Sequence, residues 1–350
     1  MRAVVYRGQE DMRVEDVADP GLVDAGDVVL RIERTAICGS DLHLWHAPEF
    51  PATGFVVGHE FLGTIEDAGD DVRSVAAGDR VLVSCTIGCG RCASCRRGVY
   101  SGCSAATKGG TTTNVFGFGD DYPGGQAEAV RVPFADVNCF RLPDGLDDEQ
   151  CLFLTDILPT GYMGSELAEV GPGDTVVVFG CGPVGTFAQR SCQLRGAARV
   201  IAVDLDAGRL RRAAERGCET VNPAEGDVVA TVLELTHGEG ADKSIEAVGL
   251  PDLVTQAAMV TRPGGIVAVI GVILAPYEIE WPIFFSKNLG LRTGLVNPQV
   301  FIPRLLPLIE QERLDPTEII SHRFALDAAA EAYRTFADHR DDVLKVVLTP

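Results

Sequence analysis

The feature that most constrains the fold is a glycine pattern, Gly180-x-Gly182-x-x-Gly185, that directly follows the β-branched and aromatic run at residues 175–179. In a strand–turn–helix unit, the first glycine allows the tight turn and the second lets the backbone approach a pyrophosphate. The third lets the helix pack closely on the strand. Because free N–H groups at a helix N-terminus attract anions, the pattern predicts a dinucleotide site at this turn. A glycine-rich turn without a ligand is the alternative.

An acidic residue, Asp204, lies nineteen residues beyond Gly185, at the end of the next expected strand. Its carboxylate can accept hydrogen bonds from the adenosine ribose, and it would repel a 2′-phosphate. The sequence therefore favours NAD over NADP, although Arg209 in the following helix could offset a phosphate. We expect the cofactor-binding residues to include also Pro183, Val184 and Ile270.

The chain has 350 residues, enough for about two domains, and its character changes near residue 157. Before this point, short expected strands such as 28–33 and 80–84 and recurrent Gly-Asp turns indicate a β-rich, partly barrel-like domain. Beyond it, strands alternate with helices, as in a parallel sheet of the α/β class. The expected strands are 175–179, 199–203, 244–248 and 266–272, and the expected helices include 183–194 and 207–216.

Acidic residues outnumber basic ones by 50 to 30, which gives a net charge of −20. A chain this acidic repels phosphate backbones and anionic lipid surfaces, so we expect no nucleic-acid or membrane partner. The apolar runs are shorter than the roughly 18 residues of a membrane span, and the N-terminus lacks the pattern of a secretory signal. We therefore expect a cytoplasmic protein. The acidity fits either a high-GC genome or a salty cytoplasm.

Five of the eleven cysteines fall between Cys85 and Cys103. Four of them follow the spacing Cys89-x2-Cys92-x2-Cys95-x7-Cys103, and in a cytosolic chain such clustering favours metal binding over disulfides. Four thiolates on one short lobe are typical of a closed, tetrahedral structural zinc site. An iron–sulfur cluster, which also uses four cysteines, is the alternative.

A second candidate metal site is dispersed along the chain. Cys38 lies in the segment Thr-Ala-Ile-Cys-Gly-Ser-Asp-Leu-His, and His59 lies in Val-Gly-His-Glu-Phe. Each has an ordinary structural explanation, because free cysteines are often buried and a lone histidine is often a core residue. A third ligand would have to come from elsewhere in the fold, so spacing alone does not define this site.

In this order along the chain, Cys38-Gly-Ser-Asp-Leu-His43, Gly58-His59-Glu60, the four-cysteine lobe and Gly180–Gly185 resemble the medium-chain, zinc-dependent alcohol dehydrogenases. The resemblance covers essentially the whole chain. It implies a GroES-like catalytic, zinc-binding domain formed by residues 1–156 and 297–350. Residues 157–296 would form a doubly wound Rossmann domain that binds NAD. Two zinc ions per chain are implied, one catalytic and one structural.

In that family, a cysteine and a histidine that match Cys38 and His59 hold the catalytic zinc, and a third ligand comes from the segment before the nucleotide-binding domain. Here the segment reads Phe-Leu-Thr-Asp156-Ile-Leu-Pro-Thr-Gly, similar to bacterial secondary-alcohol dehydrogenases and glutathione-independent formaldehyde dehydrogenases. The resemblance therefore assigns Asp156 as the third ligand, with Cys151 as the nearby competitor. It also implies that Glu60 visits the metal when water or product exchanges.

The resemblance assigns further roles around these ligands. Ser40 and His43 match a proton relay that runs through the cofactor ribose. Asp41 would hold the second ring nitrogen of His59 and so fix its tautomer. The structural alternatives are a surface histidine for His43 and a turn residue for Asp41.

Three more positions match the family on the cofactor side. Thr160 matches a nicotinamide contact, and Lys345 matches a basic residue that reaches the pyrophosphate. Residues 288–296 match the edge strand through which family members pair, so the resemblance implies a homodimer or homotetramer.

The implied function is hydride transfer between NAD and a small primary or secondary alcohol, or the corresponding aldehyde or ketone. The nearest alternative is a glutathione-independent formaldehyde dehydrogenase or dismutase. Members of that subgroup carry a long insertion over the cofactor, for which 350 residues leave little room. A polyol dehydrogenase is disfavoured by the third-ligand segment, and a non-catalytic zinc protein by the complete dinucleotide motif. The sequence determines neither the exact substrate nor the physiological direction.

Overall fold

The computed structural model describes residues 1–47, 52–110, 113–274, 276–338 and 342–350. The chain divides into two compact units, one formed by Met1–Pro159 with Val296–Pro350 and the other by Thr160–Leu295. These boundaries lie three residues and one residue from the expected ones. The first difference arises because helix α4 (Ile157–Leu167) runs through the junction, so the junction has no loop in the sequence to mark it.

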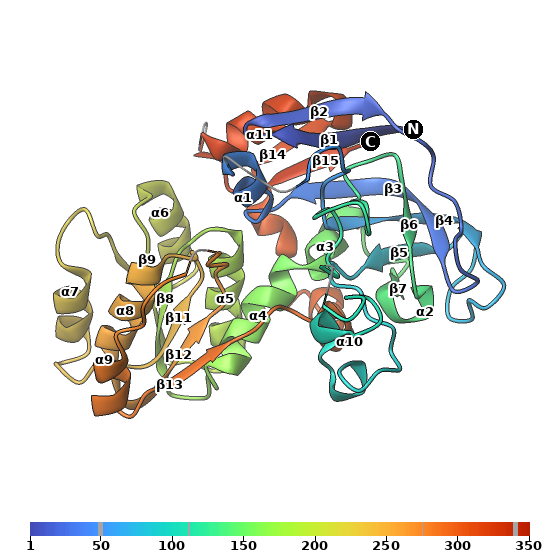
Figure 1. Ribbon diagram of the computed structural model, residues 1–350. Coiled ribbons are helices and arrows are strands. Elements are labelled where there is room, and N and C mark those ends of the chain that lie inside the picture. Colours follow the sequence, from blue (N-terminus) through green and yellow to red (C-terminus); the bar gives the residue numbers. More distant parts are fainter. Residues whose placement is uncertain (48–51, 111–112, 275, 339–341) are drawn as a thin grey trace. The chain divides into compact units, whose positions relative to one another are not determined.

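The elements of the two units are labelled in Figure 1. The strands are β1 (Arg2–Gly8), β2 (Asp11–Asp16), β3 (Val28–Ile37), β4 (Glu60–Ala68), β5 (Arg80–Val83), β6 (Ala129–Val132), β7 (Cys139–Arg141), β8 (Thr175–Phe179), β9 (Arg199–Val203), β10 (Glu219–Val221), β11 (Ala241–Glu246), β12 (Thr261–Val269), β13 (Gly290–Thr293), β14 (His322–Ala325) and β15 (Val346–Thr349). The α-helices are α1 (Asp41–His46), α2 (Ala135–Asn138), α3 (Asp148–Leu152), α4, α5 (Pro183–Leu194), α6 (Ala207–Glu215), α7 (Val228–Leu235), α8 (Pro251–Val260), α9 (Trp281–Ser286), α10 (Pro298–Glu310) and α11 (Ala329–Ala337). Short 3-10 helices cover Cys95–Arg97, Tyr100–Gly102, Phe153–Thr155, Pro316–Ile319 and Leu326–Ala328.

The unit formed by Thr160–Leu295 contains a six-stranded sheet in the order β10-β9-β8-β11-β12-β13, with every neighbouring pair parallel. This is the doubly wound order, in which the chain starts at β8 and proceeds first to one edge and then to the other. Helix α5 packs on β8 and β9, and α8 packs on β11 and β12, on opposite faces of the sheet (Figure 1). The Rossmann architecture expected from the sequence is confirmed.

Local sequence determined several of these elements to the residue. The predicted strands at 175–179 and 199–203 and the predicted helix at 183–194 coincide with β8, β9 and α5. The strands expected at 244–248 and 266–272 are shifted towards the N-terminus. They become β11 and β12, because parallel pairing between Ala241 and Thr261 extends the ladder backwards.

The other unit is built on a mixed seven-stranded sheet in the order β14-β15-β3-β4-β5-β7, with β6 also paired to β3. Strands β14 and β15 are parallel, whereas β15 pairs with β3 antiparallel. The C-terminal strand is thereby inserted beside β3, which also pairs antiparallel with β4. A hairpin of β1 and β2 forms a separate sheet (Figure 1). The β-rich domain expected from the sequence therefore includes the C-terminal residues.

Each unit has its own apolar core. Alternate residues of β3 and β4, such as Leu30 and Phe61, fill the core of the first unit. In the second, Val177, Ile201 and Val267 come from three strands of the parallel sheet, β8, β9 and β12. Burial of each such side chain stabilises the fold by roughly 1.5–3 kcal/mol before entropy costs. Within the described parts of the chain, no helix combines the length and the apolar composition that crossing a bilayer requires.

A buried carboxylate fixes the loop that follows β11. Glu246 has no exposed surface, and its Oε1 accepts hydrogen bonds from the backbone N–H groups of Val248 (2.8 Å), Gly249 (2.7 Å) and Leu250 (3.4 Å). Burial raises the pKa of this carboxyl, and the N–H donors oppose that rise. The loop in turn brings Val248 against the turn after β8, since a Cβ on Gly180 would lie 2.7 Å from a Val248 methyl.

Replacing Glu246 by alanine should therefore lower the free energy of unfolding by about 2 kcal/mol, because three partly buried N–H groups lose their acceptor. The measurement is urea unfolding followed by circular dichroism. Glu219→Ala is a matched control, since Glu219 pairs with Arg199 (2.7 Å) on a partly exposed edge of the same unit and should cost less than about 1 kcal/mol. Equal losses in the two variants would contradict this account.

Candidate metal centres and nucleotide-binding turn

Strand pairing brings the first two candidate ligands together. In the antiparallel ladder of β3 and β4, Ala36 pairs with Glu60. The residues just beyond this pair, Cys38 after β3 and His59 before β4, therefore lie at the same end of the ladder. Both side chains are buried, with 5% and 2% of their surface exposed.

Asp156 reaches the same place from a different part of the chain. It follows the 3-10 helix Phe153–Thr155, which is fixed to the sheet by a hydrogen bond from the Cys85 N–H to the Thr155 carbonyl (2.9 Å). Asp156 Oδ2 lies 3.6 Å from the Cys38 sulfur and 3.3 Å from His59 Nε2. One donor atom from each of Cys38, His59, Glu60 and Asp156 lies within 4.8 Å of all the others. The structure thus brings together the four side chains that the sequence placed at the catalytic metal.

The charges of this cluster favour a cation at its centre. Burial opposes a charged imidazole at His59, but Asp41, Cys38 and Asp156 outweigh burial and raise the His59 pKa well above its usual value. Burial and the Glu60 carboxylate raise the pKa of the Cys38 thiol. Protons are therefore held tightly where several negative groups converge. A metal cation would satisfy the same groups.

The orientation of His59 is set by a chain of buried polar groups. Its Nδ1 lies 3.4 Å from Asp41 Oδ1, and Asp41 Oδ2 accepts hydrogen bonds from the Cys38 N–H (2.9 Å) and from Gln126 (3.2 Å). Tyr333 in turn donates to Gln126 (2.8 Å). The position expected for Asp41 agrees with this geometry. Gln126 and Tyr333 were missed, because no local pattern in the sequence relates them to Asp41.

The two expected relay residues lie at different depths. The Ser40 hydroxyl is 3.0 Å from His59 Nε2, the ring nitrogen that faces the cluster. His43 lies on the exposed side of the short helix α1. Ser40 therefore belongs to the site, whereas His43 lies at the surface of α1.

Lys345 is placed differently from its expected role at a pyrophosphate. Its side chain has no exposed surface, and its ammonium donates to Glu60 Oε1 at 2.8 Å. The ammonium also lies 5.7 Å from the centre of the Phe153 ring. Burial opposes the charge of Lys345, but Glu60 and Cys38 outweigh it and raise the Lys345 pKa. The pairing of β15 with β3 carries Lys345 inside the unit, and its role at the pyrophosphate, taken from the family resemblance, stays a prediction.

Two further cysteines lie near the ligand segment. Cys151 on α3 is fully buried and is not part of the four-residue cluster. Cys85, which the sequence analysis left without a role, is the thiol that hydrogen-bonds to Asp156, and burial and this carboxylate raise its pKa well above the usual value. A neutral thiol that donates to Asp156 helps to orient the carboxylate towards the cluster.

The four cysteines of the lobe also converge. The sulfur of Cys92 lies 3.4 Å from that of Cys95 and 3.9 Å from that of Cys103. The Cys89 N–H donates to the Cys103 sulfur at 3.3 Å. Backbone N–H donors, first that of Cys95, lower the pKa of Cys92 to about 5. These donors favour a thiolate at Cys92, whereas burial and the neighbouring cysteines raise the pKa of Cys95 to about 12.

The glycine turn has the geometry that its sequence predicts. Gly180 adopts a φ of +96°, which favours glycine. A Cβ on Gly185 would lie 2.0 Å from the Gly180 carbonyl oxygen, so the helix could not approach the strand with any larger residue. Gly182 precedes α5, and Pro183 is the first residue of that helix. Gly182, Pro183 and Val184 are all partly exposed, so the helix N-terminus is accessible to an anion.

Asp204 has a structural role in addition to the one expected. Its carboxylate accepts hydrogen bonds from the Cys181 N–H (2.7 Å) and from the Asp206 N–H (2.9 Å). It therefore fixes the glycine turn and the start of α6 at once. An Arg209 guanidinium nitrogen lies 3.9 Å from the position of a Cβ on Gly182, so this cation stands beside the turn.

Two residues expected to bind the cofactor remain. One lies inside the same unit, and the other lies at its boundary. Ile270 is buried, and its methyl would be 2.7 Å from a Cβ on Gly164 of α4. Thr160, near the start of α4, is partly buried. The structure alone assigns neither residue to a ligand.

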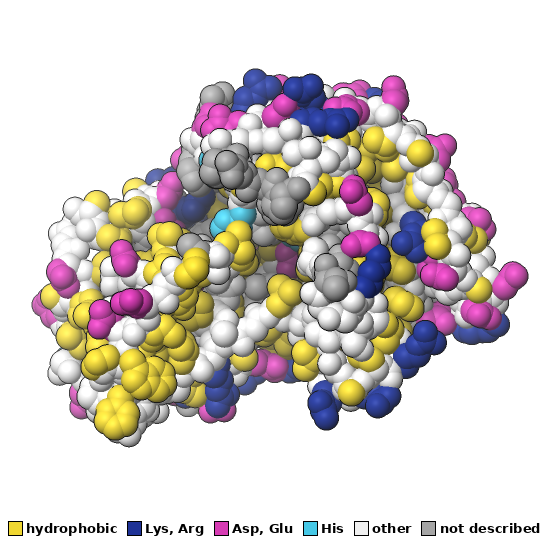
Figure 2. Space-filling model, in the orientation of Figure 1, with side chains coloured by type: hydrophobic (Ala, Val, Ile, Leu, Met, Phe, Trp, Pro, Cys, Tyr) yellow, Lys and Arg dark blue, Asp and Glu magenta, His cyan; other side chains and the backbone are white. Residues whose placement is uncertain are grey.

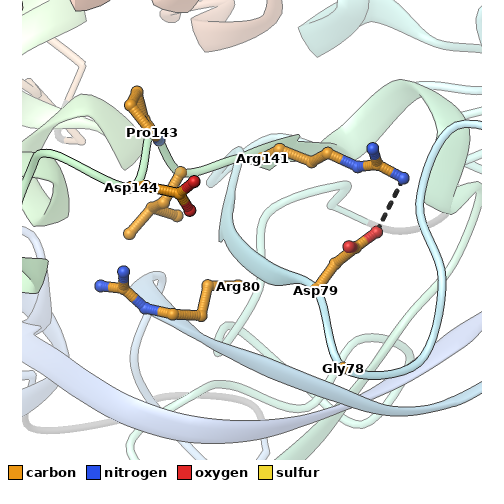
Figure 3. Close-up of a pocket in the computed structure, with 7 residues that line it drawn as sticks. Gly78, Asp79, Arg80, Arg141, Pro143 and Asp144 are labelled. Atoms are coloured by element: carbon orange, nitrogen blue, oxygen red, sulfur yellow. Dashed lines mark ion pairs between the residues drawn. The ribbon is translucent and has the colours of Figure 1, made fainter.

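A surface pocket lies away from all these residues. It is lined by Gly78, Asp79, Arg80, Leu142 and their neighbours on the segments that flank β5 and β7 (Figure 3). Arg141 pairs with Asp79 at 2.9 Å, and Arg80 pairs with Asp148. Because nearby carboxylates already neutralise both guanidinium groups, the pocket offers no free positive charge to an anion.

Both clusters fit zinc in donor chemistry. A thiol, an imidazole and a carboxylate are ligands that zinc accepts, and three protein ligands are typical of catalytic sites with an open position. Four thiols on one lobe are typical of closed structural sites, which have no room for a substrate. Because both clusters are largely buried, their ionised thiols and carboxylates would be costly in free energy without a cation nearby.

Comparison with known proteins identifies the family to which the chain belongs. Residues 24–144 match the family model of the alcohol dehydrogenase GroES-like domain, and residues 183–311 match that of zinc-binding dehydrogenases. An alcohol dehydrogenase from Cupriavidus necator is 36% identical over 372 residues, which cover 100% of this chain and 99% of that protein. The solved alcohol dehydrogenase from Thermus sp. ATN1 has a TM-score of 0.91 and 37% identity, covering 100% of this chain and 99% of that one.

A further solved structure, from Sinorhizobium meliloti 1021, was determined with NADP bound. It is 30% identical with a TM-score of 0.85, covering 100% of this chain and 99% of that one. From these matches, the chain belongs to the medium-chain, zinc-dependent alcohol dehydrogenase family. It is an oxidoreductase with a GroES-like and a Rossmann domain.

Proposed function

We propose that the protein is an NAD-dependent alcohol dehydrogenase that oxidises a small primary or secondary alcohol, or reduces the corresponding aldehyde or ketone. The observation that carries the proposal is the convergence of Cys38, His59 and Asp156 within one buried cluster. Three ligands of mixed type leave a fourth position for a substrate oxygen. The four-cysteine lobe would hold a second, structural zinc. Membership of the family supports both assignments.

The residues of the cluster have distinct tasks in this reaction. Bound zinc would act as a Lewis acid on the substrate oxygen. The Asp41 carboxylate, 3.4 Å from His59 Nδ1, would favour a proton on that nitrogen and so leave Nε2 unprotonated and turned to the cluster. The Ser40 hydroxyl, 3.0 Å from that nitrogen, is the polar group best placed to take a proton from the substrate. His43 at the surface of α1 could then pass the proton to solvent.

We infer that the cofactor is NAD rather than NADP. Asp204 directly follows β9 beside the glycine turn, and a carboxylate there repels a 2′-phosphate. Arg209, close to Gly182, supplies an opposing charge that could bind a phosphate. The relative from Sinorhizobium meliloti was solved with NADP, so the preference is a property to be measured for each chain.

A substrate panel tests the proposal directly. Primary and secondary alcohols are supplied with NAD, and NADH formation is followed at its absorbance band. Oxidation of small alcohols supports the proposal, whereas dismutation of formaldehyde without added cofactor would favour the formaldehyde dehydrogenase alternative. NAD binding without turnover of any alcohol or aldehyde would point to a non-catalytic zinc protein.

We propose a homodimer or homotetramer. Strand β13 is the edge of the parallel sheet, paired with β12, and an unpaired edge is a template for another strand. Large apolar side chains are exposed on α9 and on the segment before it, and Figure 2 shows hydrophobic side chains gathered over α9. They include Leu274 (72% exposed), Trp281 (60%) and Phe285 (77%). A patch of this kind marks an interaction surface.

Asp156→Asn tests the third ligand. Asparagine keeps the shape but lacks the negative oxygen, so we expect loss of most activity and of the catalytic zinc, with the lobe zinc retained. Zinc per chain by atomic emission, together with turnover, measures this. Asp147→Asn is the control, because Asp147 caps α3 and asparagine caps equally well. Full zinc content and near-normal turnover in Asp156→Asn would mean that the ligand lies elsewhere.

Cys95→Ala tests the lobe. Removing one of four thiolates should release one zinc per chain and lower the melting temperature while the other cluster keeps its metal. Cys139→Ala is a matched control, because Cys139 is buried in the same core but outside the lobe cluster. Iron in the purified protein, or a single zinc in the unaltered chain, would overturn the two-site assignment.

Asp204→Ala tests the cofactor preference. The change loosens the glycine turn, so binding of both cofactors should weaken, but the ratio of kcat/KM for NAD over NADP should fall by about tenfold as the repulsion disappears. Steady-state kinetics with each cofactor gives that ratio. An unchanged ratio, or an unaltered chain that already prefers NADP, would show that Asp204 acts only on the turn.

A further inference from the structure

Four potential ligands converge in the catalytic cluster, yet an open zinc site uses three. The fourth, Glu60, has a donor oxygen within 4.8 Å of those of Cys38, His59 and Asp156. A carboxylate at this distance can bind zinc and would close the site. Some other interaction must therefore keep Glu60 off the metal whenever the substrate occupies the fourth position.

Lys345 is the residue that forms an ion pair with Glu60. Its Nζ lies 2.8 Å from Oε1 and also 2.8 Å from Oε2, and neither side chain has any exposed surface. Oε1 accepts a hydrogen bond from the ammonium, whereas Oε2 lies within ion-pair distance of it but has no hydrogen-bond partner among the described residues. Asp156 and His59, by contrast, face each other and the Cys38 sulfur.

The backbone holds Lys345 firmly in this place. β15 pairs with β3 so that Val346 lies opposite Ile37, which puts the preceding residue, Lys345, at the level of Cys38. The Ser321 hydroxyl accepts from the Lys345 N–H (3.1 Å), and the Lys345 carbonyl accepts from the Ser321 N–H (3.0 Å). On its other side, the ammonium faces the Phe153 ring. The position of the ammonium is therefore set by the sheet and not by a flexible tail.

We propose that Lys345 sets the coordination number of the catalytic zinc by holding Glu60 away from it, so that three protein ligands bind and the fourth position stays open. This inference rests on the zinc site proposed above. Lys345 is a positioning residue that acts through Glu60. Without the ammonium, the Glu60 carboxylate would be a buried charge without a partner. The nearest cation that could take the place of the ammonium is the metal.

The proposal predicts that removal of Lys345 slows the loss of zinc, the opposite of what a purely structural role predicts. If Lys345 only stabilised the fold, its removal would loosen the cluster, and zinc would be lost faster. If Lys345 restrains Glu60, its removal adds a ligand, so zinc would be held more tightly while activity falls. Under the proposal, the rate of zinc loss and the turnover both fall. Under a purely structural role, the rate of zinc loss rises while the turnover falls.

The experiment uses the zinc-loaded protein and Lys345→Met, which keeps the length of the side chain. Release of the catalytic zinc to an excess of chelator should slow by about tenfold or more, a change typical of altered metal surroundings, and kcat should fall. Lys287→Met is the control, because the Lys287 ammonium donates to the Ala258 and Met259 carbonyls in the other unit. That variant should release zinc at the rate of the unaltered protein.

The double variant Lys345→Met/Glu60→Gln identifies the added ligand. It removes both charges of the buried pair, which proteins often tolerate, and the slow release should disappear. Its release rate should match that of Glu60→Gln alone within about twofold, as expected when the second change acts only through the first.

Zinc release from Lys345→Met at the normal or a faster rate would overturn the proposal, as would slow release that persists in the double variant. Failure of Lys345→Met to fold even with zinc present would also overturn it, because Glu60 would then have found no new partner. Failure of the proposed zinc site itself looks different. In that case the unaltered protein would hold only the lobe zinc, and there would be no catalytic zinc to release.

Discussion

The antiparallel pairing of β3 with two neighbours is the constraint on which the catalytic unit depends. On one side, β4 brings Glu60 opposite Ala36 and so places His59 beside Cys38. On the other side, β15 brings Val346 opposite Ile37 and so places Lys345 beside the same cysteine. A shift of either register by one residue would turn these side chains to the opposite face of the sheet. The pairing of the backbone strands therefore sets the positions of the side chains in the site.

The cluster is a concentration of buried charge that has to be compensated. Cys38, Asp41, Glu60 and Asp156 are negative or can become so, and all are buried. Part of the compensation is built into the chain, since Lys345 pairs with Glu60 and backbone and Gln126 donors bind Asp41. The donors left facing one another are Cys38, His59 and Asp156. In this view the fold separates Glu60 and Asp41, which pair with an ammonium and with amide donors, from Asp156, which faces Cys38 and His59.

Features that are local in the sequence could be predicted, and features that depend on distant strands could not. The turn at Gly180–Gly185 and the helix after it follow from neighbouring residues, and the four cysteines of the lobe lie within fifteen positions. The pair of Glu60 and Lys345 joins residues 285 positions apart. Gln126 donates to Asp41, and Tyr333 donates to Gln126, over long separations along the chain that no local pattern reveals. Asp204 was expected at the end of the strand after the turn, but its bond to the Cys181 N–H was visible only in three dimensions.

The central claim is that Cys38, His59 and Asp156 hold a zinc ion from which Lys345 keeps Glu60 away. Anomalous diffraction from crystals of the zinc-containing protein, recorded above and below the zinc absorption edge, tests it most directly. The account predicts two anomalous peaks per chain, one within the four-cysteine lobe and one bonded to the Cys38 sulfur, His59 Nε2 and an Asp156 oxygen, with Glu60 still on Lys345. A single peak in the lobe, or a second peak whose third protein ligand is Cys85 or Glu60 instead of Asp156, would contradict it.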